Sequence, residues 1–231
     1  MTPNFVEYNN TDILMDSLAL TVTEELKKFL DEKELVTLSL PGGSTPKPLF
    51  DRLSMKKLDW QRIVVIPNDE RFVPETSMLS NCGLIRKMLL KNFANGAHLL
   101  SFFKPNLSAE DLSKVIGDEI KNFLPIDICI IGMGVDMHIA SIFPDADKLN
   151  EALDLTTLQT ILPIKAPSIN ETRLTLTAKV LRESTKLHLL LTGKEKRRAL
   201  EFALKSKVSW AIAPVRSILY DRNEVNIHYA N

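Results

Sequence analysis

Apolar residues recur at near-helical spacing in several stretches of this chain. Over residues 9–30 the spacing predicts a first helix, with Thr11 as its N-cap. Over residues 108–123 the expected cap is Ser108, and acidic residues in the first turn favour a helix N-terminus there. The other predicted helices follow the turn at 41–46 and cover 80–90 and 194–205, the last of them basic and amphipathic.

Short continuous apolar runs between these helices predict buried strands. Strands that alternate with helices and are apolar on both faces are typical of a mostly parallel sheet covered on both sides. No repeat or long polar linker divides the chain. We therefore predict an α/β fold, a single domain over residues 1–231 with a mostly parallel, Rossmann-like sheet and helices on both faces. The predicted strands are 35–40, 63–66, 126–131, 173–177, 187–191 and, closing the sheet, 227–229.

Composition narrows the possible partners and the location. The 231 residues include 29 basic and 29 acidic side chains, and this neutral balance argues against nucleic-acid and membrane-surface binding. Cys82 and Cys129 stand beside apolar residues and are expected to be inert buried thiols. We find no secretory leader and no apolar run long enough to span a bilayer. We expect a cytoplasmic protein, a monomer or small homo-oligomer, that acts on a small molecule.

Polar residues and glycines gather where the predicted strands end. In open α/β sheets, ligands bind outside the carboxyl ends of the strands. Five of the eight glycines fall in these loops, which favours close approach of the backbone to a ligand. After the successive strands stand Gly42, Gly43, Ser44 and Thr45; Asn68, Asp69, Glu70 and Arg71; Gly132, Gly134, Asp136 and His138; and Gly193, Lys194 and Lys196.

The turn Gly42-Gly43-Ser44-Thr45 has two interpretations. Before a helix, its backbone N–H groups can form a nest for a phosphate or a developing oxyanion. The alternative is a tight turn with a Ser or Thr cap, and the turn alone favours neither. It lacks the spacing and the lysine of a P-loop. Gly132-Met133-Gly134 lacks the third glycine of a dinucleotide fingerprint, which disfavours a nicotinamide enzyme.

Two short polar segments carry candidate chemistry. Asp69-Glu70-Arg71 follows a buried strand, and a solvated loop with an ion pair is its simpler explanation. Asp136-Met137-His138 is the sharper signal, because a carboxylate two residues from an imidazole can orient it as a general base. The other histidines, His98, His188 and His228, are interpreted as polar surface groups. The sequence thus singles out His138.

Other classes of site are disfavoured. The histidines and cysteines lack metal-ligand spacing, so no zinc site is predicted. A Gly-x-Ser-x-Gly elbow is missing from the sequence, which argues against a serine hydrolase. Basic residues near the same sheet edge are candidates for binding a phosphate. For Lys194 and Arg197 a solvated helix face is favoured, whereas Arg173 and Lys196 stay open.

Six sequence blocks stand in order along the chain: Leu40–Lys47, Asn68–Pro74 followed by Ser80-Asn81, Ile131–Pro144, Arg173–Thr177, Thr192–Lys196 and Ala213–Leu219. Together they resemble the 6-phosphogluconolactonase family over roughly residues 10–220. That family is similar in fold and site to glucosamine-6-phosphate deaminases. Deaminases carry a glutamate in an Ala-Phe-Asn-Glu-Pro stretch, where this chain has Ala140-Ser141-Ile142-Phe143-Pro144, the lactonase form.

The resemblance implies hydrolysis of 6-phospho-D-glucono-1,5-lactone to 6-phospho-D-gluconate in the oxidative pentose phosphate pathway, without a metal or redox cofactor. His138 would be the general base and Asp136 its orienting acid. Backbone N–H groups of the glycine turn would meet the oxyanion. The family's usual Asp-Gly-His has Met137 at its centre here, and this side chain either points outward or narrows the pocket. The substrate-binding residues would be Gly42, Gly43, Ser44, Thr45, Asp69, Arg71, Arg173 and Lys196, with Asp69 contacting sugar hydroxyls or ordering Arg71.

Two other functions stay open at this point. An aldose-ketose isomerising deaminase would release ammonia from an amino sugar phosphate, and the absent glutamate argues against it. A non-catalytic sugar-phosphate-binding homologue, with catalysis impaired by Met137, would be stabilised by its ligand without turnover. We favour the lactonase because the acid Asp136 and the imidazole of His138 are both present.

Overall fold

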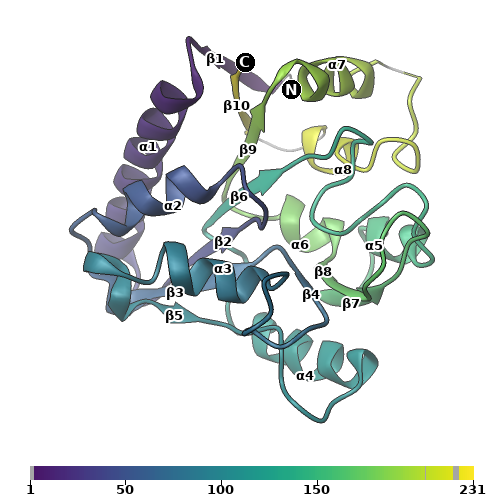
Figure 1. The fold of residues 1–231 in the computed structure, drawn as a ribbon, viewed down its shortest axis with the longest axis horizontal. Coiled ribbons are helices and arrows are strands. Elements are labelled where there is room, and N and C mark those ends of the chain that lie inside the picture. The colour runs from purple at the N-terminus through teal and green to yellow at the C-terminus, as the bar shows by residue number, and fades with distance from the viewer. Residues whose placement is uncertain (1–2, 206, 221–223) are drawn as a thin grey trace.

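A parallel sheet forms the centre of the fold. The computed structural model describes residues 3–205, 207–220 and 224–231. Within these ranges the main sheet has seven strands, and every neighbouring pair in it runs parallel. In spatial order the strands are β1 (Asn4–Tyr8), β10 (Asn226–Ala230), β9 (Lys186–Thr192), β6 (Ile128–Gly132), β2 (Val36–Leu40), β3 (Ile63–Pro67) and β5 (His98–Leu99) (Figure 1).

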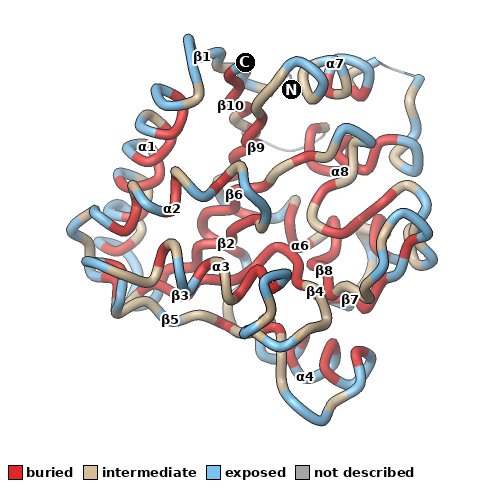
Figure 2. Tube along the Cα trace, viewed as in Figure 1, coloured by how far each residue is buried: buried red, intermediate tan, exposed pale blue. Residues whose placement is uncertain are grey.

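Helices cover both faces of this sheet, so the predicted fold class is confirmed. Strand β6 shows why two covers are needed, because Ile128 and Ile130 enter one apolar cluster while Cys129 and Ile131 enter the other. Figure 2 shows the central strands buried between the helices. One cluster packs α1 (Thr11–Glu32), α2 (Lys47–Ser54) and α3 (Asn81–Met88); the other packs α4 (Ala109–Lys121), α5 (Leu149–Leu153), α6 (Ala178–Arg182), α7 (Lys194–Ala203) and α8 (Arg216–Leu219).

A second, antiparallel sheet lies beside the first and was not predicted. It has the order β4 (Asp69–Arg71), β8 (Arg173–Leu176) and β7 (Ile161–Ile164). The sequence predicts a strand at β8 but a polar loop at β4. Three charged residues carry no strand pattern of their own, and β4 exists because its backbone pairs with β8, about a hundred residues later in the chain.

The chain termini depart from the prediction in two ways. Residues 227–229 do form a strand, but β10 lies inside the sheet and β1 forms the edge beyond it. The first helix is capped by Asn10, whose side chain accepts a hydrogen bond from the backbone N–H of Ile13, so the prediction of Thr11 as N-cap is wrong. Ser108 is the N-cap of α4, as predicted. Short 3₁₀ helices span Trp60–Arg62 and Asn92–Gly96.

None of the helices in the described ranges is long and apolar enough to cross a membrane.

Candidate active site

A cavity of about 290 Å³ opens at the carboxyl ends of the strands. It lies where the chain order of the sheet reverses: β3 pairs with one side of β2, and β6 pairs with the other. Such a switch point is the usual ligand site of open α/β sheets. Nine of the ten predicted site residues line the cavity, namely Gly42, Gly43, Ser44, Thr45, Asp69, Arg71, His138, Arg173 and Lys196. The tenth, Asp136, stands behind His138.

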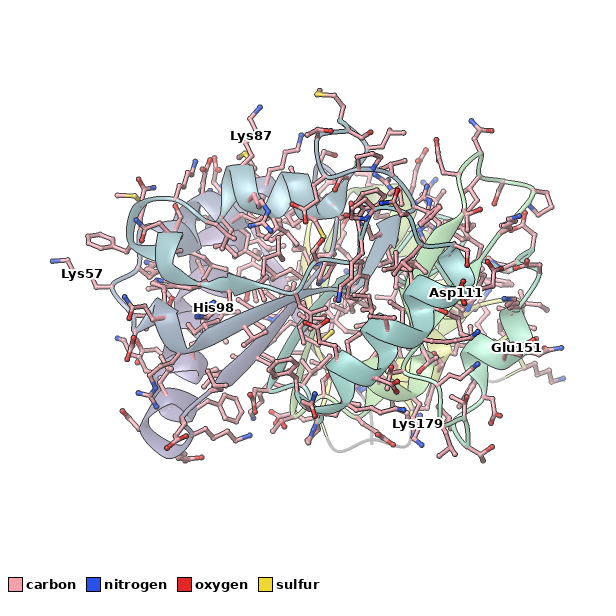
Figure 3. All side chains as sticks on the ribbon, turned by 90° about the horizontal axis from the view of Figure 1, so that it is seen from below. Lys57, Lys87, His98, Asp111, Glu151 and Lys179 are labelled. Carbon is pink, nitrogen blue, oxygen red and sulfur yellow. The ribbon has the colours of Figure 1, made fainter. Side chains whose placement is uncertain are left out.

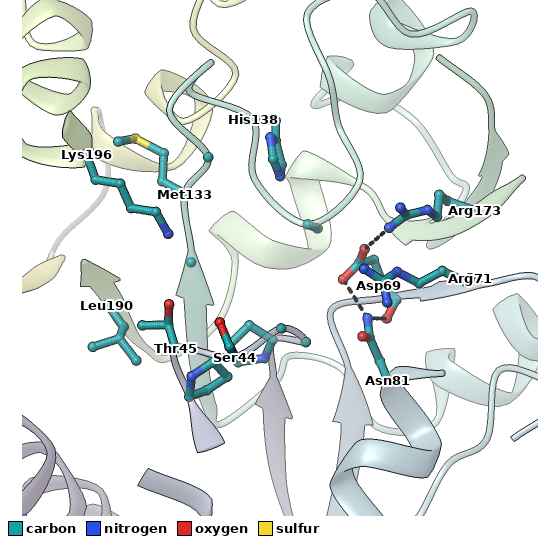
Figure 4. Close-up of a pocket in the computed structure, with 17 residues that line it drawn as sticks. Ser44, Thr45, Asp69, Arg71, Asn81, Met133, His138, Arg173, Leu190 and Lys196 are labelled. Atoms are coloured by element: carbon teal, nitrogen blue, oxygen red, sulfur yellow. Dashed lines mark hydrogen bonds and ion pairs between the residues drawn. The ribbon is translucent and has the colours of Figure 1, made fainter. Parts of the chain in front are cut away.

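The turn Gly42-Gly43-Ser44-Thr45 after β2 lines the cavity, and Ser44 and Thr45 lie below His138 in the view of Figure 4. Gly43 has φ +89°, a conformation that side-chain-bearing residues rarely adopt. A Cβ on Gly42 would approach the Asn81 side-chain oxygen to 1.9 Å, so this position is also restricted to glycine. The backbone N–H groups of Gly42, Gly43 and Ser44 donate no hydrogen bond to any described residue. They are therefore free to bind an anionic or polar oxygen.

The loop after β6 carries the carboxylate–imidazole pair. Asp136 Oδ1 and His138 Nδ1 lie 2.6 Å apart. Among the described residues nothing hydrogen-bonds His138 Nε2, and the side chain is 28% exposed at the cavity wall. A carboxylate on Nδ1 favours the tautomer that carries its proton there, which leaves Nε2 as a proton acceptor. A Cβ on Gly134 would meet both side chains of the pair within 2.3 Å, so glycine at this position makes room for them.

The environment of Asp136 keeps it ionised. Burial raises its pKa, but hydrogen bonds and the charge of His138 outweigh that effect, so the pKa of Asp136 lies below its ordinary value. The acid is therefore a carboxylate at neutral pH and can accept the Nδ1 proton of His138.

Met137 fits neither of the positions that the sequence suggested. Its φ is +67°, which explains why glycine is usual between the acid and the histidine. The side chain neither lines the cavity nor stands free, because it packs partly buried against the apolar core. The Met137 carbonyl accepts a hydrogen bond from the backbone N–H of Val215, at 3.1 Å. Core packing and this hydrogen bond thus hold methionine in a left-handed conformation.

Asp69 is a buried carboxylate at the cavity edge. Ser141 Oγ donates a hydrogen bond to its Oδ2 at 2.5 Å, and Asn81 Nδ2 reaches its Oδ1 at 3.3 Å. Its ion-pair partner is Arg173, at 3.9 Å, rather than Arg71. The prediction of a solvated loop at Asp69-Glu70-Arg71 is wrong, because β4 pairs in a sheet and its first two residues are buried.

Two guanidinium groups stand next to each other at this edge. The pairing of β4 with β8 sets Arg71 opposite Arg173. The Nε atoms of both are buried without a hydrogen-bond partner in the described part of the chain. Burial lowers the pKa of Arg173, and the charge of Arg71 lowers it further. Two neighbouring guanidinium groups at the cavity edge are chemically suited to bind an anion.

Lys196 lies across the cavity from the arginine pair, in the first turn of α7 (Figure 4). Burial lowers the pKa of its ammonium group. On the same helix Lys194 is exposed, as expected of a solvated face. For Arg197 that expectation is wrong, because its guanidinium lies over the rings of Phe5 and Tyr229 and also pairs with Glu7 and Glu201. Arg71 and Arg173 thus lie on one side of His138, and Lys196 lies on the other (Figure 4).

Sequence reasoning missed two residues that shape the site. Asn81 lines the cavity and connects the glycine turn to Asp69. Glu70 is fully buried, and its carboxylate accepts hydrogen bonds from Ser80 Oγ and from the backbone N–H groups of Arg71, Asn81 and Cys82, at 2.7–2.8 Å. It thereby satisfies donors at the start of α3. The sequence did single out Glu70 within Asp69-Glu70-Arg71 and Asn81 within the resemblance, but neither residue was assigned a role.

Two of the three remaining histidines are not surface groups. His188 and His228 are buried, at 0% and 4% exposure, so that prediction is wrong for both. His98 is exposed on β5, as expected (Figure 3). Both cysteines are buried thiols that form no disulfide within the described residues, so their predicted burial is confirmed, and burial raises the pKa of Cys82.

Comparisons with known proteins agree with the resemblance. Residues 9–227 match the family model described as glucosamine-6-phosphate isomerases/6-phosphogluconolactonase. A 6-phosphogluconolactonase of Pseudomonas aeruginosa is 36% identical over 213 residues, covering 92% of this chain and 88% of its own. That of Mesorhizobium japonicum is 35% identical over 204 residues, covering 88% and 84%. The crystal structure of a 6-phosphogluconolactonase from Shewanella baltica superposes with a TM-score of 0.94 at 29% identity, covering 99% of this chain and 98% of that one.

Proposed function

The chain belongs to the family of glucosamine-6-phosphate isomerases and 6-phosphogluconolactonases, and from this membership we propose that it is a 6-phosphogluconolactonase. The reaction is hydrolysis of 6-phospho-D-glucono-1,5-lactone to 6-phospho-D-gluconate, the second step of the oxidative pentose phosphate pathway. One observation supports this most: an imidazole with a free Nε2, backed by a carboxylate, faces the same cavity as an unsatisfied guanidinium pair. A base and an anion site are what hydrolysis of a phosphorylated lactone needs.

His138 acts as the general base in this proposal. Its Nε2 accepts a proton from water as the water oxygen attacks the lactone carbonyl carbon. Asp136 holds the Nδ1 proton and stabilises the imidazolium that forms, as the acid does in other triads. General base catalysis of this kind is worth about 10²–10⁴-fold in rate.

The carbonyl oxygen becomes an oxyanion facing the glycine turn. The free N–H groups of Gly42, Gly43 and Ser44 are its donors, and Lys196 supplies positive charge on the same side of the cavity. The bond between the carbonyl carbon and the ring oxygen then breaks. The ring oxygen takes the proton from His138 and becomes a hydroxyl group, so the base is regenerated and the acid product ionises.

The phosphate is placed against Arg71 and Arg173. A phosphate dianion would accept hydrogen bonds from the guanidinium groups that line the cavity and would offset the repulsion between their charges. Asp69 stays between them and the sugar, where its carboxylate accepts hydrogen bonds from substrate hydroxyls. Ser44 and Thr45 also line the cavity, and their hydroxyl groups can donate hydrogen bonds to the substrate.

Buried cysteine thiols outside a disulfide suit a reducing compartment, so we also propose a cytoplasmic location. The partner is a small sugar-phosphate lactone rather than nucleic acid or membrane, in keeping with the neutral charge balance.

A pH-stat assay with freshly prepared 6-phosphogluconolactone, corrected for spontaneous hydrolysis, tests the activity. The phosphate position is tested by Arg173→Ala, which should raise KM by about 10–100-fold through loss of charged hydrogen bonds. The same variant should change little with unphosphorylated gluconolactone. Lys194→Ala, which removes an exposed charge, is the control. Ammonia release from glucosamine 6-phosphate without lactone turnover would replace this proposal with a deaminase.

A further inference from the structure

We propose that Phe143 is a positioning residue that sets the orientation of the His138 imidazole. The two ring centroids lie 4.2 Å apart, with 34° between the planes. Phe143 is a buried apolar residue, 6% exposed, whereas His138 stands at the cavity wall. The inference rests on the proposed function in one respect, that His138 is the group whose orientation matters for turnover.

A single hydrogen bond leaves the imidazole free to swing. Rotation about the bond that joins Cβ to the ring is soft in histidine. Asp136 holds Nδ1 at 2.6 Å, but this carboxylate is 43% exposed and water competes for it. Contact with one face of the ring removes the freedom that the hydrogen bond leaves. Together the two contacts direct Nε2 toward the cavity.

Phe143 can do this because it is held firmly. The loop just before it is fixed by Ser141, whose Oγ bonds the buried carboxylate of Asp69 at 2.5 Å and whose N–H bonds Thr175 Oγ1 at 3.2 Å. The Phe143 carbonyl accepts the N–H of Ala146 at 3.1 Å. These contacts anchor the segment that carries Phe143 to β4 and β8 of the antiparallel sheet.

The phenyl ring of Phe143 also shapes the surroundings of the His138 imidazole. An apolar ring against the imidazole keeps water from that side of it. A smaller aliphatic side chain would leave a gap beside the imidazole, because it lacks the flat face of the phenyl ring. We therefore expect shape, rather than hydrophobicity alone, to matter at this position.

The test variant is Phe143→Leu, with kcat, KM and the imidazole ¹⁵N chemical shifts of His138 as readouts. We expect kcat to fall about 10–100-fold, the scale of a misplaced catalytic group, with KM within about twofold. The ¹⁵N shifts should show a larger share of the tautomer protonated on Nε2, because Asp136 no longer holds a well-aligned Nδ1–H. With four histidines in the chain, selective labelling gives a readable spectrum.

Phe102→Leu is the matched control. Phe102 is also a buried phenylalanine, at 0% exposure, and has no ring contact with His138. Its loss should lower Tm but leave kcat and the ¹⁵N shifts of His138 unchanged. Should Phe143→Leu fail to fold, Phe143→Met supplies a flexible, unbranched side chain that fills irregular gaps but has no planar face, and it should show the same change of tautomer.

Unchanged kcat and unchanged ¹⁵N shifts in Phe143→Leu would overturn the proposal, as would equal effects of both leucine variants. The spectroscopic arm does not depend on turnover. A wild-type protein without lactonase activity would therefore refute the proposed function, while the tautomer comparison would still decide whether Phe143 orients the ring.

Discussion

Within the described residues two carboxylate–imidazole pairs occur, and one of them faces the cavity at the strand ends. Asp136 and His138 lie 2.6 Å apart at the cavity wall. Glu25 on α1 and His188 on β9 lie 2.8 Å apart, and the histidine side chain is wholly buried. The two pairs are nearly the same in length, so a short contact between an acid and a histidine does not by itself identify a catalytic base.

The difference lies in the other ring nitrogen. His188 Nδ1 is 3.0 Å from His228 Nε2, and His228 Nδ1 is 2.9 Å from the Tyr8 hydroxyl. With both rings neutral, protons fall in one order: tyrosine donates to His228, His228 to His188, and His188 to Glu25. All four ring nitrogens of this buried chain are occupied. His138 has one nitrogen free, and that nitrogen is what proton transfer needs.

Removing the free nitrogen should have the largest effect. His138→Ala is expected to lower kcat about 10²–10⁴-fold while the protein stays folded, because general base catalysis is lost and the core is untouched. The pH-stat assay and a thermal melt measure the two quantities. Full lactonase activity in this variant would remove His138 from the mechanism.

Changing the acid of the exposed pair should cost less. Asp136→Asn keeps the shape but no longer favours the Nδ1–H tautomer, and we expect kcat to fall by about 10²-fold, the low end of the range for a general base. The matched change in the buried pair, Glu25→Gln, should lower the free energy of unfolding and leave kcat unchanged. If Glu25→Gln lowered kcat as much as Asp136→Asn, the contrast between the pairs would fail.

The buried histidines that extend the Glu25–His188 pair should make the stability of the fold sensitive to acid. Burial, and then the charge of His188, lowers the pKa of His228 to about 3, whereas an unfolded histidine titrates near 6.5. Between these values the unfolded chain binds a proton that the folded chain does not, so stability is lost as pH falls below about 6.5. At pH 5 this one group costs on the order of 2 kcal/mol.

Denaturant melts at pH 7 and pH 5 measure that loss. His228→Gln should weaken the protein at pH 7, because hydrogen bonds are lost, yet show a flatter dependence on pH. An equally steep dependence in the variant would assign the acid sensitivity to other groups.

The smallest effect is expected at Met137. Met137→Gly relieves a left-handed φ that costs a side-chain-bearing residue about 1–2 kcal/mol, but loses apolar packing of similar worth. Because the side chain does not line the cavity, kcat should change less than about twofold. A large gain in activity would instead mean that methionine misplaces the neighbouring acid and base.

These contrasts explain what the sequence could predict. Asp136 and His138 are two residues apart, so their pairing was readable, and the continuous run 35–40 led directly to β2. The contacts of Asp69 with Ser141 and Arg173 were not readable, because they depend on the pairing of β4 with β8. Long-range pairing of a charged three-residue strand leaves no local pattern.

His188 could have been predicted better. It stands inside the apolar run 187–191, which was correctly assigned to a buried strand. A histidine in such a run is buried with its strand and needs partners for both nitrogens. The partners themselves, on β10 and α1, are set by the order of strands in the sheet.

The position of β1 at the sheet edge has a consequence for synthesis on the ribosome. Among the described strands, β1 pairs with β10 alone, so Asn4 meets Asn226 across nearly the whole length of the chain. Among the described strands β1 is translated before all the others and β10 after them, so β1 acquires its sheet partner only after β10 has been synthesised. Until then Tyr8 lacks the histidine that accepts its hydrogen bond. Closure of this edge depends on the pairing of the two described strands that are farthest apart in the sequence, and β1 is an unpaired strand until β10 is in place.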